Sequence, residues 1–262
     1  MTHDPVLPAA YESLFGLATD VAALDGLQLV TYVRNGRPLQ ATLRQGAVLS
    51  VAVHRGLGPR FRAQLGAEWT EVPTSLREVL NTSASLAGTT DGLVIHLPGR
   101  SSEGKTEDAL LSFRDIHGLM EGIPPVRRRL WVQDARHIVV ACEQNAGERV
   151  RWELTPLDDV RWVAMANLQR GQVGVRCVVD PARIPDIDPV AAADRGWGMV
   201  HRGDADPRLV RVWLEAARSA RQAYGGAVPP EAFATVDSAH HWRTRTADYS
   251  VEAIEKRLAE LP

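Results

Sequence analysis

Residues Arg128 to Asp180 decide the fold that we expect, because this stretch divides into five short apolar runs separated by turn residues. The runs are RRLWVQD (128–134), RHIVVACEQ (136–144), ERVRWELTP (148–156), VRWVAMANLQ (160–169) and VGVRCVVD (173–180). In the third run, Val150, Trp152 and Leu154 alternate with charged residues, which is typical of a strand with one buried and one wet face. Strands joined by tight turns pair antiparallel. The stretch therefore predicts an antiparallel β-meander.

A second group of strands is expected nearer the N-terminus. It consists of LQLVTYV (27–33), PLQATLR (38–44) and VLSVAVH (48–54). Asn35-Gly36 joins the first two, and this dipeptide accepts the positive φ of a two-residue hairpin turn. Apolar residues at helical spacing and capping residues predict helices at about residues 9–24, 76–86, 106–120, 207–224 and 250–261. Ser75 with Glu78 makes a capping box for the second of these helices, and Pro207 takes the first position of the fourth. Residues 225–245 are expected to be loop or weak helix.

These elements predict an α+β fold made of two antiparallel β-meander lobes, each flanked by helices. The N-terminal lobe, with its basic hairpin, is expected at residues 1–98. The C-terminal lobe, at residues 99–262, contains the central meander, and the C-terminal helices pack on its sheet.

The composition is that of an ordinary globular protein, with 262 residues of which 45% are hydrophobic and 24% charged. The longest apolar runs are too short to span a bilayer, and Met1 to Ala10 contains Asp4 where a signal peptide needs a basic start. We therefore expect a cytoplasmic protein that does not contact a membrane. Cys142 and Cys177 are expected to serve packing rather than a disulfide.

The net charge of -2 hides an uneven distribution of arginine. Residues 26–67 contain six arginines and no acidic residue, and the helix at 207–224 carries Arg208, Arg211, Arg218 and Arg221 on the side opposite its apolar face. Arginines on a rigid surface suit phosphates, and an exposed aromatic side chain can stack on a base. We expect Trp131 to be that aromatic, because strand alternation places it with Arg129 on the polar face.

These patterns predict a non-catalytic protein that binds DNA or RNA. The expected contact residues are Arg34, Arg37, Arg44, Arg55, Arg60, Arg62, Arg129, Trp131, Arg208, Arg211 and Arg218. The first alternative is a homo-oligomeric or partner-binding scaffold, because Trp and Arg are also enriched in protein interfaces.

A second alternative is a nucleotide-dependent enzyme. Residues Gly99 to Thr106, GRSSEGKT, fit the P-loop pattern GxxxxGK[ST], in which Gly99 and Gly104 let the backbone wrap phosphate. Lys105 would reach the outer phosphates and Thr106 would bind Mg²⁺. The motif follows an apolar strand and precedes the helix expected at 106–120.

The remaining residues indicate no catalytic or metal site. The histidines are scattered, and the adjacent His240 and His241 cannot both face one metal from a regular helix or strand. The patterns GxSxG, HExxH and paired CxxC do not occur. We therefore assign no catalytic residue, metal ligand or cofactor from the sequence.

Overall fold

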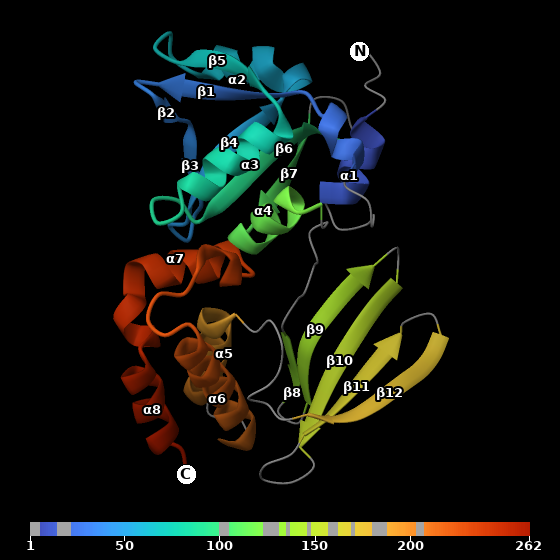
Figure 1. Ribbon diagram of the computed structural model, residues 1–262, viewed down its shortest axis with the longest axis vertical. Helices are drawn as coiled ribbons and strands as arrows, with labels where there is room; N and C mark the ends of the chain where they lie inside the picture. Colours follow the sequence, from blue (N-terminus) through green and yellow to red (C-terminus); the bar gives the residue numbers. More distant parts are fainter. Residues whose placement is uncertain are drawn as a thin grey trace. The chain divides into compact units, whose positions relative to one another are not determined.

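A computed structural model describes residues 6–14, 22–99, 105–122, 131–134, 137–145, 148–156, 162–168, 171–179, 188–202 and 207–262. The chain divides into two compact units. The first comprises residues 1–125 and 235–240, and the second comprises residues 126–234 and 241–262. Figure 1 draws the ribbon of each unit coloured along the sequence.

The first unit is built on a seven-stranded sheet with the order β2-β1-β4-β6-β7, in which β3 also pairs with β4 and β5 with β1. Its strands are β1 (Leu29–Arg34), β2 (Arg37–Pro38), β3 (Gln40–Thr42), β4 (Val48–His54), β5 (Thr70–Thr74), β6 (Gly92–Pro98) and β7 (Thr106–Leu111). The predicted hairpin is confirmed, because Asn35 and Gly36 have φ of 52° and 74° and Arg34 pairs with Arg37.

One strand pair of this sheet is parallel. β4 and β6 run in the same direction, with Val51 opposite Val94. The expectation of wholly antiparallel sheets is therefore wrong at this pair. A tight turn dictates direction only for the strands that it joins, whereas the chain between β4 and β6 crosses over through helices. The other pairs are antiparallel, so the sheet is mostly antiparallel and the α+β class is confirmed.

The helix predicted at 106–120 is also wrong in its first half. Residues 106–111 form β7, which pairs antiparallel with β6, and the helix begins only at Phe113. The period of this segment is two, because Ala109 and Leu111 are buried while Leu110 is 50% exposed. Since β6 and β7 share one sheet, the first unit extends beyond residue 98, where we expected the lobes to divide.

Four α-helices and two 3-10 helices of the first unit are described: α1 (Leu7–Leu14), η1 (Ala22–Gly26), η2 (Arg55–Leu57), α2 (Gly58–Gln64), α3 (Leu76–Ser85) and α4 (Phe113–Met120). Both α3 and α4 begin with a capping box, formed by Ser75 with Glu78 and by Ser112 with Asp115. The Ser75 backbone N–H and hydroxyl, which donate to the carboxylate, lower the pKa of Glu78. The first of these boxes was predicted from the sequence and is confirmed.

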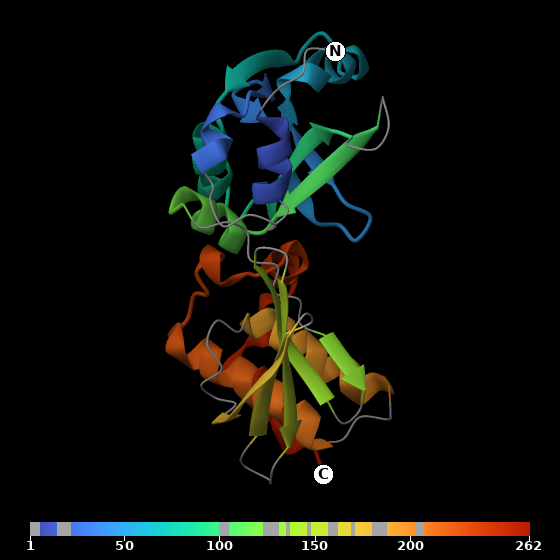
Figure 2. The same cartoon turned by 90° about the vertical axis from the view of Figure 1, so that its right-hand side faces the viewer.

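One face of the sheet carries a core of Val30, Tyr32, Leu49, Val51, Val53 and Val94. Phe61 of α2 and Leu65, which follows the helix, pack against this core, and so does Trp69, which precedes β5. Helix α3 packs against α4. The two views in Figures 1 and 2 show the helices placed around the sheet.

The second unit contains the predicted meander, whose strand order β12-β11-β10-β9-β8 is confirmed. Its strands are β8 (Trp131–Asp134), β9 (His137–Asn145), β10 (Glu148–Pro156), β11 (Trp162–Leu168) and β12 (Gly171–Val179). All four neighbouring pairs are antiparallel. We expected Trp152, Cys142 and Cys177 to pack in the core. Their side chains lie outside the described part of the structure.

The helical part of the second unit comprises α5 (Pro189–Arg202), α6 (Pro207–Ala223), η4 (Pro230–Ala232), η5 (Thr246–Tyr249) and α8 (Val251–Ala259). Helix α6 matches its predicted bounds and packs against both α5 and α8. Helix α5 was not predicted. Helix α7 (Val236–Arg245) lies where loop or weak helix was expected, and its residues 236–240 belong to the first unit and 241–245 to the second.

Candidate functional site

Three arginines and a tryptophan meet on the surface of the first unit. The guanidinium of Arg34 lies 4.9 Å from the centre of the Trp69 ring and 3.4 Å from Oε1 of Glu68. Arg62 donates hydrogen bonds to the backbone carbonyls of Gly66 and Trp69. Arg37 lies directly across the hairpin from Arg34. We call Arg34, Arg37, Arg62 and Trp69 the Arg–Trp cluster.

Three parts of the fold bring this cluster together. The two-residue turn at Asn35 and Gly36 sets Arg34 beside Arg37, since directly paired residues of antiparallel strands point to the same face. Pairing of β5 with β1, in which Thr70 lies opposite Val33, carries Trp69 back to the end of β1. Helix α2, which packs on the core through Phe61, supplies Arg62.

A buried tyrosine fixes the base of the cluster. The Tyr32 hydroxyl lies 2.8 Å from the carbonyl oxygen of Gly58 and 3.2 Å from Oε2 of Glu71, so its proton bridges β1, α2 and β5. Burial, with the Glu71 carboxylate beside it, raises the pKa of Tyr32 to about 12. The hydroxyl therefore stays protonated at neutral pH and holds the three elements in one geometry.

The charge of the cluster is only partly neutralised. Glu68 binds Arg34 on the surface, where the two side chains are 50% and 53% exposed. The side chain of Arg37 forms no hydrogen bond or ion pair within the described part of the chain. The sequence showed no acidic residue between 26 and 67, and the fold supplies two from the next segment, Glu68 and Glu71.

The other arginines of the basic segment are exposed at separate places. Arg55 donates to Oε1 of Gln28 at 3.3 Å, and Arg44 forms no polar contact with a described residue. Arg60 lies on α2, two residues before Arg62, and is exposed. The Arg–Trp cluster is therefore the densest part of the predicted basic surface that the described residues show.

The arginines of α6 have a different environment. Arg211 and Arg218 are half-buried, and Nε of Arg218 is buried without a hydrogen-bond partner among the described residues. We expected Arg221 on the wet side of this helix, and that expectation is wrong. Arg221 is 8% exposed and donates to the carbonyls of Tyr249 (2.9 Å) and Gly226 (3.0 Å).

The reason is that α6 packs against α5 and α8, and that Tyr249 and Trp242 contact the Arg221 side chain. Burial lowers the pKa of Arg221, and its guanidinium lies 4.6 Å from the centre of the Trp242 ring. The side chain of Arg208, the residue Arg129 and the side chain of Trp131 lie outside what the structure describes. Trp69 is the aromatic residue that sequence reasoning missed, because its position depends on the pairing of β5 with β1.

The segment from Gly99 to Thr106 does not connect a strand to a helix, which is the order of elements that a phosphate-binding P-loop requires. Thr106 is the first residue of β7 and pairs with Pro98 across the sheet. The Gly99 N–H donates to the carbonyl of Lys105 (2.8 Å), as in a connection between antiparallel strands. Lys105 is exposed, and Gly104 lies outside the described residues.

The adjacent histidines of α7 bind two different aspartates. In the first unit, Nδ1 of His240 lies 3.3 Å from Oδ2 of Asp91, a fully buried carboxylate that also accepts from the Val48 N–H (2.8 Å). In the second unit, Nδ1 of His241 lies 2.6 Å from Oδ2 of Asp194. The divergence of neighbouring side chains on a helix was expected, but their partners come from distant segments.

Asp194 is the centre of a polar network in the second unit. The hydroxyl of Tyr249 donates to Oδ1 of Asp194 (2.7 Å) and accepts from Nη2 of Arg245 (2.8 Å). Burial, with Asp194 beside it, raises the pKa of Tyr249 well above its ordinary value. An aspartate that orients a histidine is also part of general-base sites. Here both carboxylate oxygens are engaged, so the network ties α5, α7 and η5 together.

Among the described residues, no group of three or more His, Cys, Asp or Glu side chains is arranged to hold a metal ion. No helix in the same part of the chain is long and apolar enough to cross a membrane. Comparison of the chain with protein-family models, with curated proteins and with solved structures finds no significant match.

Proposed function

We propose that this protein binds nucleic acid and that the Arg–Trp cluster of the first unit is the contact surface. The observation that carries the proposal is that Arg34 lies over the Trp69 ring, Arg62 bonds the Trp69 carbonyl, and Arg37 lies directly across the hairpin from Arg34. Binding rather than catalysis is proposed, because these groups supply charge and a stacking surface.

Three members of the cluster, Arg37, Arg34 and Trp69, have distinct physical roles in this proposal. Arg37, exposed and unpaired among the described residues, keeps its full charge for a phosphate. Arg34 can exchange its exposed contact with Glu68 for a phosphate, since exposed ion pairs contribute at most about 1 kcal/mol. The half-buried ring of Trp69 offers an edge or face to a base, and such stacking contributes about 1–3 kcal/mol per base.

The proposal favours single-stranded nucleic acid, because an aromatic ring stacks only on a base that has left its duplex stack. Fluorescence anisotropy at low ionic strength with a labelled single-stranded DNA, a single-stranded RNA and a DNA duplex tests this. The cluster should bind the single strands more tightly than the duplex. Replacing Trp69 with Ala should remove that preference and leave a weaker, charge-dependent affinity.

A charge reversal tests the location of the surface. Arg37→Glu should weaken binding at least about tenfold, because it removes one phosphate contact and adds a repulsive charge. Lys256→Glu is the matched control, since Lys256 is exposed on α8 in the second unit. Equal losses of affinity in the two variants would contradict the proposed location. Absence of any salt-dependent binding of DNA or RNA by the unaltered protein would contradict the function. A concentration-dependent mass in light scattering would then favour the oligomeric scaffold.

A further inference from the structure

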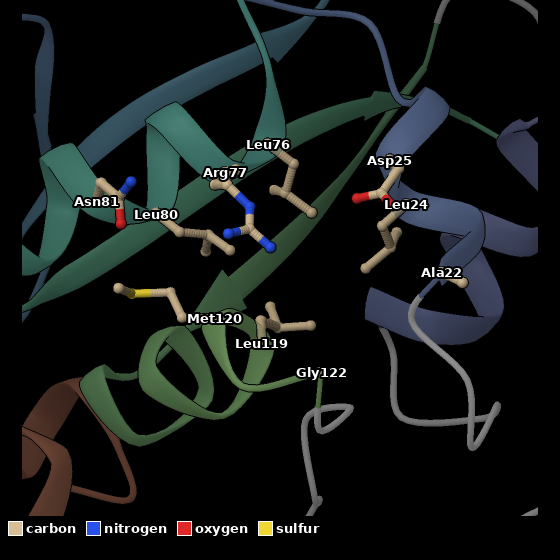
Figure 3. A pocket seen from close by; sticks show the side chains of 10 residues that line it. All are labelled: Ala22, Leu24, Asp25, Leu76, Arg77, Leu80, Asn81, Leu119, Met120 and Gly122. Carbon is tan, nitrogen blue, oxygen red and sulfur yellow. The ribbon is translucent and has the colours of Figure 1, made fainter.

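A pocket of about 360 Å³ opens on the first unit, among elements that the Arg–Trp cluster does not use. Figure 3 shows it between η1, the first half of α3 and the end of α4. Ligand pockets of proteins begin at about 300 Å³ and combine an apolar lining with a few polar groups. The volume therefore suits a ligand the size of an amino acid or dipeptide.

The floor of the pocket is apolar. Leu24, Leu76, Leu80 and Leu119 line it and are each buried to more than nine-tenths, with exposed fractions of 2%, 7%, 3% and 7%. Met120, at the end of α4, is 37% exposed at its edge. These side chains offer a branched aliphatic group a place to pack, and Met adapts to the shape of the group that it contacts.

Two of the three polar side chains that we consider in the pocket carry opposite charges. Arg77 and Asn81 lie one helical turn apart on α3, and Asp25 lies on η1. In Figure 3 the guanidinium of Arg77 points into the hollow above Leu119, and the carboxylate of Asp25 faces it from the opposite side. Within the described part of the chain, these three side chains form no hydrogen bond or ion pair, with one another or with other residues.

The geometry points to a binding site for a small zwitterion with an apolar side chain, that is, an aliphatic α-amino acid or a dipeptide of such residues. Arg77 binds the carboxylate, because the planar guanidinium can donate two parallel hydrogen bonds to it, and Asn81 adds an amide donor. Asp25 binds the ammonium group. The aliphatic side chain packs on Leu80, Leu119 and Met120.

This arrangement explains why both charges are present at one small apolar pocket. A simple carboxylic acid would leave Asp25 without a partner, and a simple amine would leave Arg77 without one. A zwitterion satisfies both, so recognition of the two ends should be coupled in the same ligand. The inference is independent of the proposed nucleic-acid surface.

Isothermal titration calorimetry with the full chain tests the inference, with L-leucine and the dipeptide leucyl-leucine as probes. At least one should bind saturably with a stoichiometry of one, and the tighter of the two identifies the ligand length. Two partial ligands complete the set: 4-methylpentanoic acid lacks the ammonium group of leucine, and 3-methylbutylamine lacks its carboxylate. Each should bind about fivefold more weakly, because Arg77 and Asp25 are exposed and one charged contact there contributes modestly.

The variants assign each end of the ligand. Arg77→Met should weaken the zwitterion and the acid but leave the amine unchanged, and Asp25→Asn should weaken the zwitterion and the amine but leave the acid unchanged. Lys256→Met is the matched loss of an exposed cation and should change nothing. Absence of saturable binding by both zwitterions at millimolar concentration, or equal affinities for the unaltered protein and Arg77→Met, would overturn the inference.

Discussion

Two arginines of this protein each lie against a tryptophan, and their environments make them opposite in role. Arg34 of the first unit lies 4.9 Å from the centre of the Trp69 ring with half of its side chain exposed. Arg221 of the second unit lies 4.6 Å from the centre of the Trp242 ring and is almost wholly buried. The two distances from guanidinium to ring centre are nearly the same.

The two arginines differ in the groups that accept hydrogen bonds from their guanidinium groups. Arg34 is paired with an exposed carboxylate that solvent or a ligand can replace. Arg221 donates to the carbonyl of Tyr249 in a buried hydrogen bond and to the carbonyl of Gly226 in a partly buried one, so its partners are part of the fold and not an exposed side chain. An arginine over a tryptophan is therefore a candidate for ligand binding only where its remaining donors face exchangeable partners.

The largest expected effect is the loss of stability in Arg221→Met. Methionine fills much of the same space but leaves the carbonyls of Tyr249 and Gly226 without their donor. We expect the free energy of unfolding to fall by about 2–4 kcal/mol. Urea denaturation measures it, with Arg37→Met as the exposed counterpart, which should change stability by less than about 0.5 kcal/mol. Similar effects in the two variants would break the comparison.

Double-mutant cycles sharpen the same comparison. Coupling between Arg221 and Trp242 should be about 2 kcal/mol, because their contact is largely desolvated, and coupling between Arg34 and Trp69 about 0.5–1 kcal/mol. The measurement is the free energy of unfolding of the single and double alanine variants of each pair. A larger coupling at the exposed pair would contradict our description of the two environments.

Each unit also has a buried tyrosine whose pKa is raised, Tyr32 to about 12 from an ordinary value of 10.0. The unfolded chain therefore loses these protons first as pH rises, and the folded state becomes less stable between about pH 10 and pH 12. Below pH 10 the two states hold the same protons, so stability is unaffected. Tyr32→Phe and Tyr249→Phe should each cost about 1 kcal/mol at neutral pH and make this alkaline loss shallower. If the unaltered protein, Tyr32→Phe and Tyr249→Phe all lost the same free energy of unfolding above pH 10, the raised pKa values of the two tyrosines would be contradicted.

The smallest expected effect concerns Lys105, the lysine of the P-loop pattern. It is exposed beside β7, so Lys105→Ala should change the free energy of unfolding by less than about 0.5 kcal/mol. Thermal denaturation with and without ATP or GTP measures both stability and binding. Tight nucleotide binding that the substitution abolishes would restore the enzyme alternative.

Local signals in the sequence predicted much of the fold. Asn35-Gly36 identified the hairpin, Ser75 with Glu78 identified the start of α3, and Pro207 identified the start of α6. The meander followed from its short turns. Each of these features depends on residues that are close in sequence.

The features that the sequence did not predict depend on distant partners. Residues 106–111 form a strand because β6 offers them a pairing edge, although acidic residues after Thr106 also suit a helix start. Trp69 joins Arg34 through the pairing of β5 with β1, and Arg221 is buried because Tyr249 and Trp242, from later in the chain, contact its side chain. The candidate site could be predicted as a basic segment but not as the cluster that the fold assembles.

The salt dependence of nucleic-acid binding tests the central claim most directly. If Arg34, Arg37 and Arg62 each neutralise one phosphate, log K should fall against log salt with a slope of about -2 for single-stranded DNA, at about -0.7 per contact. Arg37→Glu should make that slope shallower by about one contact, and Lys256→Glu should leave it unchanged. A slope near zero for the unaltered protein, or the same slope in Arg37→Glu, would contradict the account.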